Sequence, residues 1–387
     1  MNEAALKGIT WNHSRALPPL VAVAQRYEEL HPGIRIEWHK RTLHEFGHAS
    51  LEDLAQRFDL LVIDHPMVGD AESSGVLVDL LPLLSAAQLE DLAQDSIGPS
   101  FASYQYNGKL YALPVDAAAP AASYRPDLLE HRGVSLPATW HDLVALASAG
   151  HVRMPGFSAD IFLNFMGLCV SLGSAVAVTP DLLVEEQPGL TALEMLAELA
   201  SYMPSSIYDM NPIAIYEGMA AADKYCYCPF AYTYSNYARD GFAREQLRFT
   251  NPVSLNHQTP LRTVLGGTGI SIASRSPHRD AALDFSLFAA SRACQSTIYG
   301  LAGGQPARRS AWQDSLLNQV TNRFFERTAE SLEIAYVRPQ YRGYTVLQET
   351  AGTIIANFCR ARGDAKQALQ AINVQYRTTR RNESCNV

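Results

Sequence analysis

The spacing of apolar and polar residues changes repeatedly over the first 65 positions. In some segments apolar residues recur at every third or fourth position, which is typical of a helix with one buried face. In the segments between these, apolar residues alternate with polar ones or follow one another without a break, which is typical of strands. The predicted elements are strands at 8–12, 34–38 and 60–63 and helices at 17–30 and 43–58. This order, with short connections, predicts a parallel sheet with helices on its faces.

A second group of elements follows after residue 100. Residues 104–116 predict a hairpin with its tight turn at Asn107 and Gly108, a residue pair that favours two-residue turns. Helical spacing dominates 139–202 and returns from about residue 280 onward, interrupted at 300–306. The extended segment 265–273 is expected to return to the first sheet.

Length and charge narrow the class of protein. The chain has 387 residues, of which 47% are hydrophobic and 18% are charged. Single hydrophobic cores stop growing at around 250–300 residues, so this length predicts two lobes. No apolar run reaches the ~20 residues that a membrane span requires. The formal net charge of −8 argues against nucleic acid as a partner, because phosphate binding needs a basic face.

The cysteines and the first residues bear on the cellular address. The six cysteines form no dense, evenly spaced framework and predict no disulfide-stapled fold. The start lacks the basic and apolar stretches of a secretory leader. We therefore expect a periplasmic protein if a leader was removed and a cytoplasmic one if Met1 is native, and the sequence as it stands favours the cytoplasm. Ligand identity and oligomeric state do not follow from the sequence.

Five motifs spread over essentially the whole chain occur in an order that is typical of one family. They are the hairpin and crossover 107–116 with 124–129, the helix start 137–143, the return strand 266–272, the helix 280–285 and the loop 303–310. In these motifs the chain resembles the extracellular solute-binding proteins of family 1, which are the carbohydrate-type receptors of ABC importers.

The resemblance implies a bilobed, type II periplasmic-binding-protein fold. Two α/β lobes, joined by crossing strands near 114–116 and 262, would clamp a ligand in the cleft between them. The implied lobes are 1–113 plus 262–305 and 114–261 plus 306–387. The implied partners are a small-molecule ligand and an ABC permease.

Polar residues at two strand ends are the main candidates for ligand binding. In open parallel sheets, ligands bind beyond the carboxyl ends of the strands. The candidates are Trp11, Asn12, His13 and Arg15 after the first strand and Asp64 and His65 after the third. Their histidines and arginine favour an acid or an anionic sugar derivative as ligand. The competing interpretation is that Asn12 or Ser14 and Asp64 only cap helices, and that both histidines are solvated.

Further candidates lie outside these two loops. Asp116 follows the crossover strand, where the resemblance implies a ligand-contacting carboxylate or a hinge residue; the alternative is a turn-forming residue. Tyr232, Tyr234 and Asn236 share one parity of an alternating segment, and rings with polar ends suit a polar ligand. A tyrosine-rich core strand is the alternative. Gly267 is expected to allow close backbone approach in the cleft.

Two short motifs are set aside. Residues 44–48 match the H-E-x-x-H pattern of zinc hydrolases. Gly47 weakens that helix and no third ligand stands at a suitable spacing, so no metal site is predicted. The glycines at 266–269 precede a strand, whereas a dinucleotide loop follows one. No cofactor is therefore predicted.

Two functions compete. The leading prediction is a solute-binding protein that closes its lobes on a small polar ligand by a hinge motion, without covalent chemistry. The alternative is a cytoplasmic enzyme on the same fold, in which His13 and His65 exchange protons with a substrate, helped by Asp64 or Asp116. In the first case, loss of both histidines is expected to weaken ligand binding without unfolding the protein.

Overall fold

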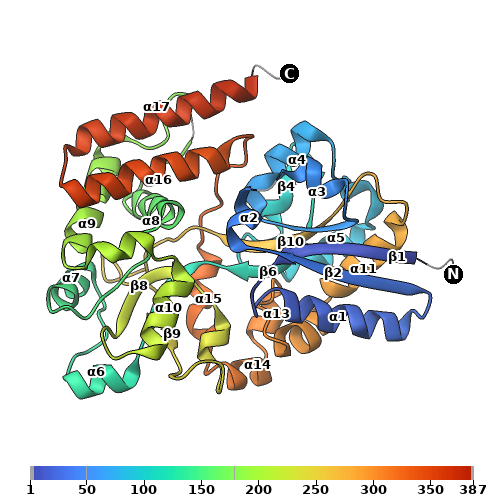
Figure 1. Cartoon of the computed structure of the whole chain (residues 1–387), viewed down its shortest axis with the longest axis horizontal. Coiled ribbons are helices and arrows are strands. Elements are labelled where there is room, and N and C mark those ends of the chain that lie inside the picture. The colour runs from blue at the N-terminus through green and yellow to red at the C-terminus, as the bar shows by residue number, and fades with distance from the viewer. Residues whose placement is uncertain (1–3, 49, 178, 385–387) are drawn as a thin grey trace. The chain divides into compact units, whose positions relative to one another are not determined.

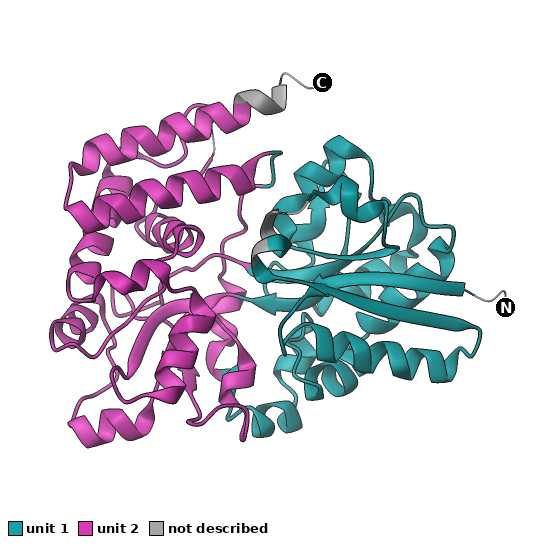
Figure 2. Cartoon of the chain, in the orientation of Figure 1, with its two compact units in different colours: residues 1–118, 266–326, 340–342 teal, residues 119–265, 327–339, 343–387 magenta. Residues whose placement is uncertain are grey.

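The chain divides into two compact units. The computed structural model describes residues 4–48, 50–177 and 179–384 (Figure 1). Unit 1 comprises residues 1–118, 266–326 and 340–342, and unit 2 comprises residues 119–265, 327–339 and 343–387 (Figure 2). Within the described ranges, no helix is both long enough and apolar enough to cross a membrane.

Unit 1 is built on a five-stranded sheet in the order β2-β1-β3-β10-β6. Its strands are β1 (Ala4–Trp11), β2 (Ile34–Arg41), β3 (Leu60–Ile63), β6 (Leu113–Ala118) and β10 (Gly266–Ile272). β1 is parallel to β2 and β3, whereas β10 is antiparallel to β3 and β6. The predicted return of 265–273 to the first sheet is confirmed. Because that strand arrives from a distant part of the chain and enters in the opposite direction, the sheet is mixed rather than wholly parallel.

Helices surround this sheet. They are α1 (Leu17–Leu30), α2 (Leu43–His48), α3 (Leu51–Ala55), α4 (Val68–Ser74), α5 (Ala86–Gln94), α11 (Arg279–Ala289), α12 (Arg292–Cys294), α13 (Arg309–Trp312) and α14 (Ser315–Val320). α1 runs along β2 and also contacts α11 (Figure 1). α1 and β3 have the predicted bounds. The predicted helix over 43–58 is instead two helices, and Ser50 caps the second by accepting a hydrogen bond from the amide of Asp53.

The predicted hairpin is present in unit 1. It joins β4 (Gln105–Tyr106) to the antiparallel β5 (Lys109–Leu110). Asn107 and Gly108 both have positive φ, 49° and 74°. Two consecutive residues in this conformation make the tight turn whose twist matches the flanking strands, so the prediction from this residue pair is confirmed.

Unit 2 combines a small antiparallel sheet with long helices. The strands, in the order β8-β7-β9, are β7 (Pro120–Tyr124), β8 (Tyr227–Tyr232) and β9 (Arg248–Thr250). The helices are α6 (Pro126–Arg132), α7 (Trp140–Ser148), α8 (Ser158–Ser171), α9 (Glu186–Ser201), α10 (Pro212–Ala221), α16 (Tyr344–Ala361) and α17 (Ala365–Ser384), and α15 (Phe324–Glu333) begins in unit 1 and continues in unit 2. α16 packs against α8, α9 and α17 (Figure 1).

The segment 306–326 belongs to unit 1, although the sequence placed it in the second lobe. Arg308 decides this. Its side chain is 4% exposed and donates hydrogen bonds to the backbone oxygens of Ala290 and Asp91, both at 2.7 Å. The neighbouring Arg309 amide donates to the oxygen of Asp95. These bonds attach the segment to α5 and α11 of unit 1, and the sequence gives no sign of partners more than 200 positions away.

Candidate functional site

Six polar side chains of unit 1 lie at or beyond the edge where its strands end. They are His13, Arg15, Arg41, Asp64, His65 and Asp116, and we call them the strand-tip group. β1, β2 and β3 are parallel, and β6 runs the same way as β3 because both are antiparallel to β10. Their carboxyl ends therefore share one edge of the sheet, which is where ligands of open α/β sheets bind.

A buried ion pair joins Arg15 to Asp116. The Arg15 Nε donates to Asp116 Oδ2 at 2.8 Å, and its Nη2 donates to Oδ1. Arg15 is 4% exposed and Asp116 1%. Burial raises the pKa of the Asp116 carboxyl and the Asp64 carboxylate adds to this shift, while the Arg15 guanidinium opposes it. Asp116 lies within β6, opposite Thr268 of β10, so the turn-forming alternative is wrong.

His13 is held as a neutral imidazole. The backbone amide of Arg15 donates to His13 Nδ1 at 3.0 Å, so this nitrogen is an acceptor and the ring proton sits on Nε2. Burial, and secondarily the Arg15 charge, lower the pKa of His13 to about 4. Neither Asn12 nor Ser14 caps α1: its N-cap is Ala16, which offers no side-chain hydrogen bond.

This lowered pKa makes stability depend on pH. In the unfolded chain His13 takes up a proton near its ordinary pKa of 6.5, but in the folded chain only near pH 4. The unfolded state therefore binds more protons between these values, and stability is lost as the pH falls from 6.5 to 4, by up to about 3 kcal/mol. Urea unfolding at pH 7.5 and pH 4.5 checks this. His13→Gln should lose about 2 kcal/mol less than the unaltered chain over that range; equal losses would contradict it.

Asp64 and His65 form a second local pair. Asp64 Oδ1 accepts a hydrogen bond from the His65 amide at 2.9 Å, which caps the short 3₁₀ turn His65–Met67, and lies 3.3 Å from His65 Nδ1. The capping alternative thus describes Asp64. His65 is 1% exposed and its ring meets Tyr104 edge-on, so the solvated alternative is wrong for this histidine. Replacing His65 by alanine would leave a cavity, and we no longer expect that change to spare stability.

Arg41 was missed because its strand was expected to end at residue 38. β2 continues to Arg41, which pairs with Trp11 at the end of β1. Arg41 is 7% exposed, its Nη2 donates to the Val62 oxygen at 3.2 Å, and its guanidinium lies 5.0 Å from the centre of the Phe46 ring. Burial lowers its pKa to about 10, so it remains cationic at neutral pH.

Gly267 and Gln305 fix the backbone around Asp116. Gly267 has φ of 112°, and a Cβ there would lie 2.3 Å from the Asp116 oxygen, so the predicted close backbone approach is made against β6. The Gln305 Nε2 donates to the Ala117 oxygen at 3.0 Å, and the Ala117 amide donates back to the Gln305 oxygen. Gln305 was missed as an individual residue; its only signal was the motif 303–310.

Trp11 packs in the core of unit 1. It is 4% exposed, and its ring centre lies 5.1 Å from that of Phe46. Asn12, the next residue, is exposed and donates its amide to the Arg41 oxygen. Trp11 therefore contributes to the hydrophobic packing at the end of β1, and its role as a ligand-stacking ring stays a prediction.

The tyrosine-rich segment of unit 2 is only partly a strand. β8 ends at Tyr232, and Ser235–Ala238 form a 3₁₀ turn, so the expected alternation does not reach Tyr234 and Asn236. Tyr232 is half-buried and donates its hydroxyl to the Leu265 oxygen at 3.1 Å, while Tyr234 and Asn236 are 6% and 3% exposed. Their contribution to ligand binding stays a prediction.

The H-E-x-x-H match falls on α2. The side chains of His44 and His48 lie outside the described residues. Among the side chains that the structure describes, no group of three or more histidines, cysteines, aspartates or glutamates is arranged to hold a metal ion.

Comparison with known families identifies the chain. A profile of the family described as bacterial extracellular solute-binding protein matches residues 22–322, more than half of the chain. The chain belongs to this family. The family's extracellular address favours a periplasmic location, and the earlier preference for the cytoplasm is not supported. No curated protein matches the chain.

Solved structures show the fold of this solute-binding protein. Maltose-bound MalE3 of T. maritima has a TM-score of 0.79 at 18% identity, covering 97% of this chain and 99% of that one. The GacH receptor of Streptomyces glaucescens, solved unliganded and with acarbose, gives the same score and identity with 98% of each chain covered. A solute-binding protein of Agrobacterium radiobacter K84 with ribitol gives 0.79 and 18%, covering 97% and 99%. The chain has the bilobed periplasmic-binding-protein fold.

Proposed function

We propose that this solute-binding protein serves an ABC importer and that its ligand is a neutral, hydroxyl-rich small molecule, a sugar or a polyol. The strand-tip group of unit 1 forms part of the binding site. The observation that carries the proposal is the buried ion pair between Arg15 and Asp116, because it changes the charge that this edge of the sheet offers to a ligand.

The formal charges of the arginines and aspartates in the strand-tip group cancel. Arg15 and Arg41 contribute two positive charges, Asp64 and Asp116 contribute two negative ones, and His13 is neutral. Arg15 was one reason, with the two histidines, to expect an anionic ligand, but its Nε and Nη2 both donate to Asp116. A sugar acid would bring an unmatched charge to this edge, whereas hydroxyl groups can both donate to carboxylates and accept from N–H groups.

The structural relatives support the same ligand class. Those three proteins were solved with maltose, acarbose and ribitol, which carry many hydroxyl groups. The acid–base enzyme considered as the alternative draws no support from His13, because with a pKa of about 4 this imidazole is uncharged near neutral pH and lacks the second ring proton that an imidazolium general acid donates.

A thermal-shift series tests the ligand class. Neutral ligands such as maltose, ribitol and tagatose are compared with gluconate and glucuronate at equal concentration and ionic strength. At 100 times its dissociation constant, a bound ligand adds about 2.7 kcal/mol of stability, and we expect such shifts within the neutral set only. Stabilisation by the sugar acids alone would contradict the proposal of a neutral ligand and would support the earlier prediction of an anionic one.

Variants locate the site once a ligand is found. The double variant His13→Gln, Asp64→Asn keeps hydrogen-bonding groups of similar size but changes their donors and charge. It should weaken binding about tenfold or more, as loss of one or two hydrogen bonds to a polar ligand does. His141→Ala, an exposed change on α7, is the matched control and should leave affinity unaltered. Equal affinity in the double variant would exclude the strand-tip group.

A further inference from the structure

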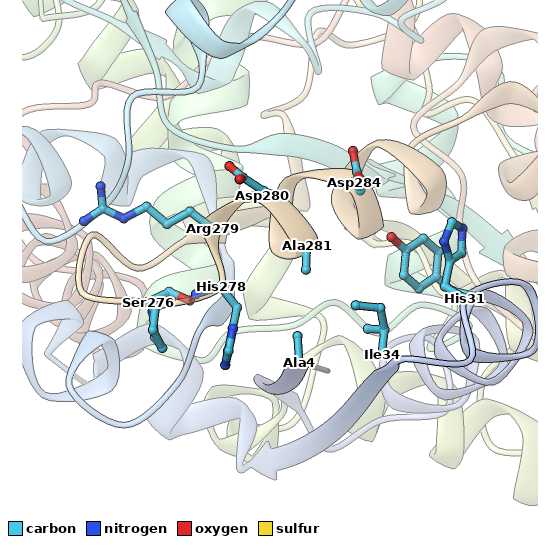
Figure 3. Close-up of a pocket in the computed structure, with 11 residues that line it drawn as sticks. Ala4, His31, Ile34, Ser276, His278, Arg279, Asp280, Ala281 and Asp284 are labelled. Atoms are coloured by element: carbon cyan, nitrogen blue, oxygen red, sulfur yellow. Dashed lines mark hydrogen bonds between the residues drawn. The ribbon is translucent and has the colours of Figure 1, made fainter. Parts of the chain in front are cut away.

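A pocket lies in unit 1, away from the strand-tip group. It has a volume of about 570 Å³ and is lined by the first residues of β1 and β2, the end of α1 and the start of α11 (Figure 3). β1 rises about 3.3 Å per residue, so its first residue, Ala4, lies roughly 23 Å from Trp11 at the other end of the strand. The volume is within the usual range for small-molecule sites.

Two carboxylates border this pocket without a partner among the described residues. Asp280 and Asp284 stand one turn apart on α11 and are exposed. Neither forms a hydrogen bond or an ion pair with any described residue. Arg279, which directly precedes Asp280 in the sequence, donates to the Ser274 oxygen, and its side chain extends away from both carboxylates (Figure 3). Asp280 lies in the first turn of α11 and stabilises the helix dipole, but Asp284 lies beyond that turn.

Tyr27 contributes to the lining of the same pocket. The side chain is 3% exposed and lines the pocket, yet its hydroxyl hydrogen-bonds to no described residue. Its ring stacks on His31 with the centres 4.2 Å apart and the planes 20° apart, and it packs edge-on against Phe285. Burial, with the Asp284 charge adding to it, raises the pKa of Tyr27 to about 12, so the hydroxyl is neutral. A hydroxyl that bonds to no described residue, beside an exposed carboxylate, leaves hydrogen-bonding capacity that a ligand or water can use.

The end of α1 favours a positive charge in this pocket, while Arg279 and the N-terminus of α11, which also border it, act against one. α1 ends at Leu30 and its C-cap is His31, so the negative end of its dipole lies at the pocket. The stacked rings of Tyr27 and His31 add an aromatic face, which attracts organic cations. No group of three metal-ligating side chains occurs among the described residues, so a bare metal ion would lack ligands here.

We propose that this pocket binds a small organic ammonium ion, whose N–H groups donate to Asp284 and to the Tyr27 hydroxyl, with Asp280 as the second carboxylate. The cation binds independently of the solute at the strand-tip group. Asp280 and Asp284 lie about 6 Å apart along the helix, as (i, i+4) neighbours do, and this spacing suits a diamine with a four-carbon chain.

Titration calorimetry with 1,4-diaminobutane tests the proposal on the full chain at low ionic strength. We expect saturable binding that weakens about tenfold in Asp284→Asn and several-fold in Tyr27→Phe, which keeps the packed ring. Glu90→Gln, the same charge change at an exposed position of α5 in the same unit, should bind like the unaltered chain. The neutral 1,4-butanediol should not bind.

Several results would overturn the proposal. One is the absence of saturable diamine binding. Another is diamine binding by Asp284→Asn and Tyr27→Phe that is as tight as that of the unaltered chain. The others are binding of 1,4-butanediol as tight as that of the diamine, and displacement of the diamine by equimolar Ca²⁺. The variant His13→Gln, Asp64→Asn should still bind the diamine normally. This last measurement separates the two sites, because failure of either one leaves the other intact.

Discussion

Asp116→Ala is expected to destabilise unit 1 by about 3–5 kcal/mol, because it leaves the Arg15 guanidinium buried without its counter-charge. Arg15 is 4% exposed, and its Nε and Nη2 both donate to Asp116. Removing the carboxylate takes away both acceptors while the positive charge stays in a region of low polarity. The loop after β1 then loses its attachment to β6.

Tryptophan fluorescence in urea measures this loss in unit 1. Trp11, Trp38 and Trp312 belong to unit 1 and Trp140 to unit 2, so a Trp140→Phe background confines the signal to unit 1. The double variant Arg15→Met, Asp116→Leu is the control. It replaces the pair by apolar side chains and should be less destabilising than Asp116→Ala alone. A loss of less than about 1 kcal/mol of unfolding free energy in Asp116→Ala would show that the ion pair contributes little to the stability of unit 1.

Gly352→Ala is expected to destabilise unit 2 by about 2–4 kcal/mol, although alanine is the better helix former. Gly352 lies in the middle of α16, and a Cβ there would stand 1.8 Å from the Ser158 oxygen at the start of α8. A carbonyl oxygen of the backbone cannot turn aside as a flexible side chain can, so α16 must move away from α8. The gain of about 1 kcal/mol from helix propensity is outweighed by the lost packing.

Thermal unfolding followed by circular dichroism checks this change. The Tm should fall by about 5 °C or more, given a shift of a few degrees per kcal/mol in units of this size. Thr353→Ala, on the exposed face of the same helix, makes an equally small change without a clash and should leave the Tm within about 2 °C. An unchanged or higher Tm in Gly352→Ala would mean that α16 can move away from α8 without loss of stability.

The sequence predicted correctly those elements that are specified by the pattern of their own residues. The three-to-four spacing over 17–30 and the apolar run over 60–63 correspond to α1 and β3, because an amphipathic helix and a fully buried strand each carry their period in their own residues. The turn at Asn107 and Gly108 was equally local. The predicted helix over 43–58 was less exact, since a break at Ser50 depends on a cap that periodicity does not reveal.

The candidate site was predicted as to place but not as to charge. The rule that ligands bind beyond strand ends selects His13, Arg15, Asp64 and His65 from the sequence. That Arg15 is neutralised depends on Asp116, which is 101 positions away. Arg41 was overlooked because its strand runs three residues farther than its alternation suggested.

From its residues alone, this protein could be assigned a bilobed α/β fold, its family resemblance and the edge of the sheet where polar side chains gather. These follow from periodicity, turn chemistry and motif order, which are properties of neighbouring residues. The tertiary structure alone decided which charges are matched, that 306–326 belongs to unit 1 and that a pocket exists in which the Tyr27 hydroxyl bonds to no described residue. Each of these results from contacts between distant segments, and the energy of a buried charge or hydroxyl depends on the groups that folding brings beside it.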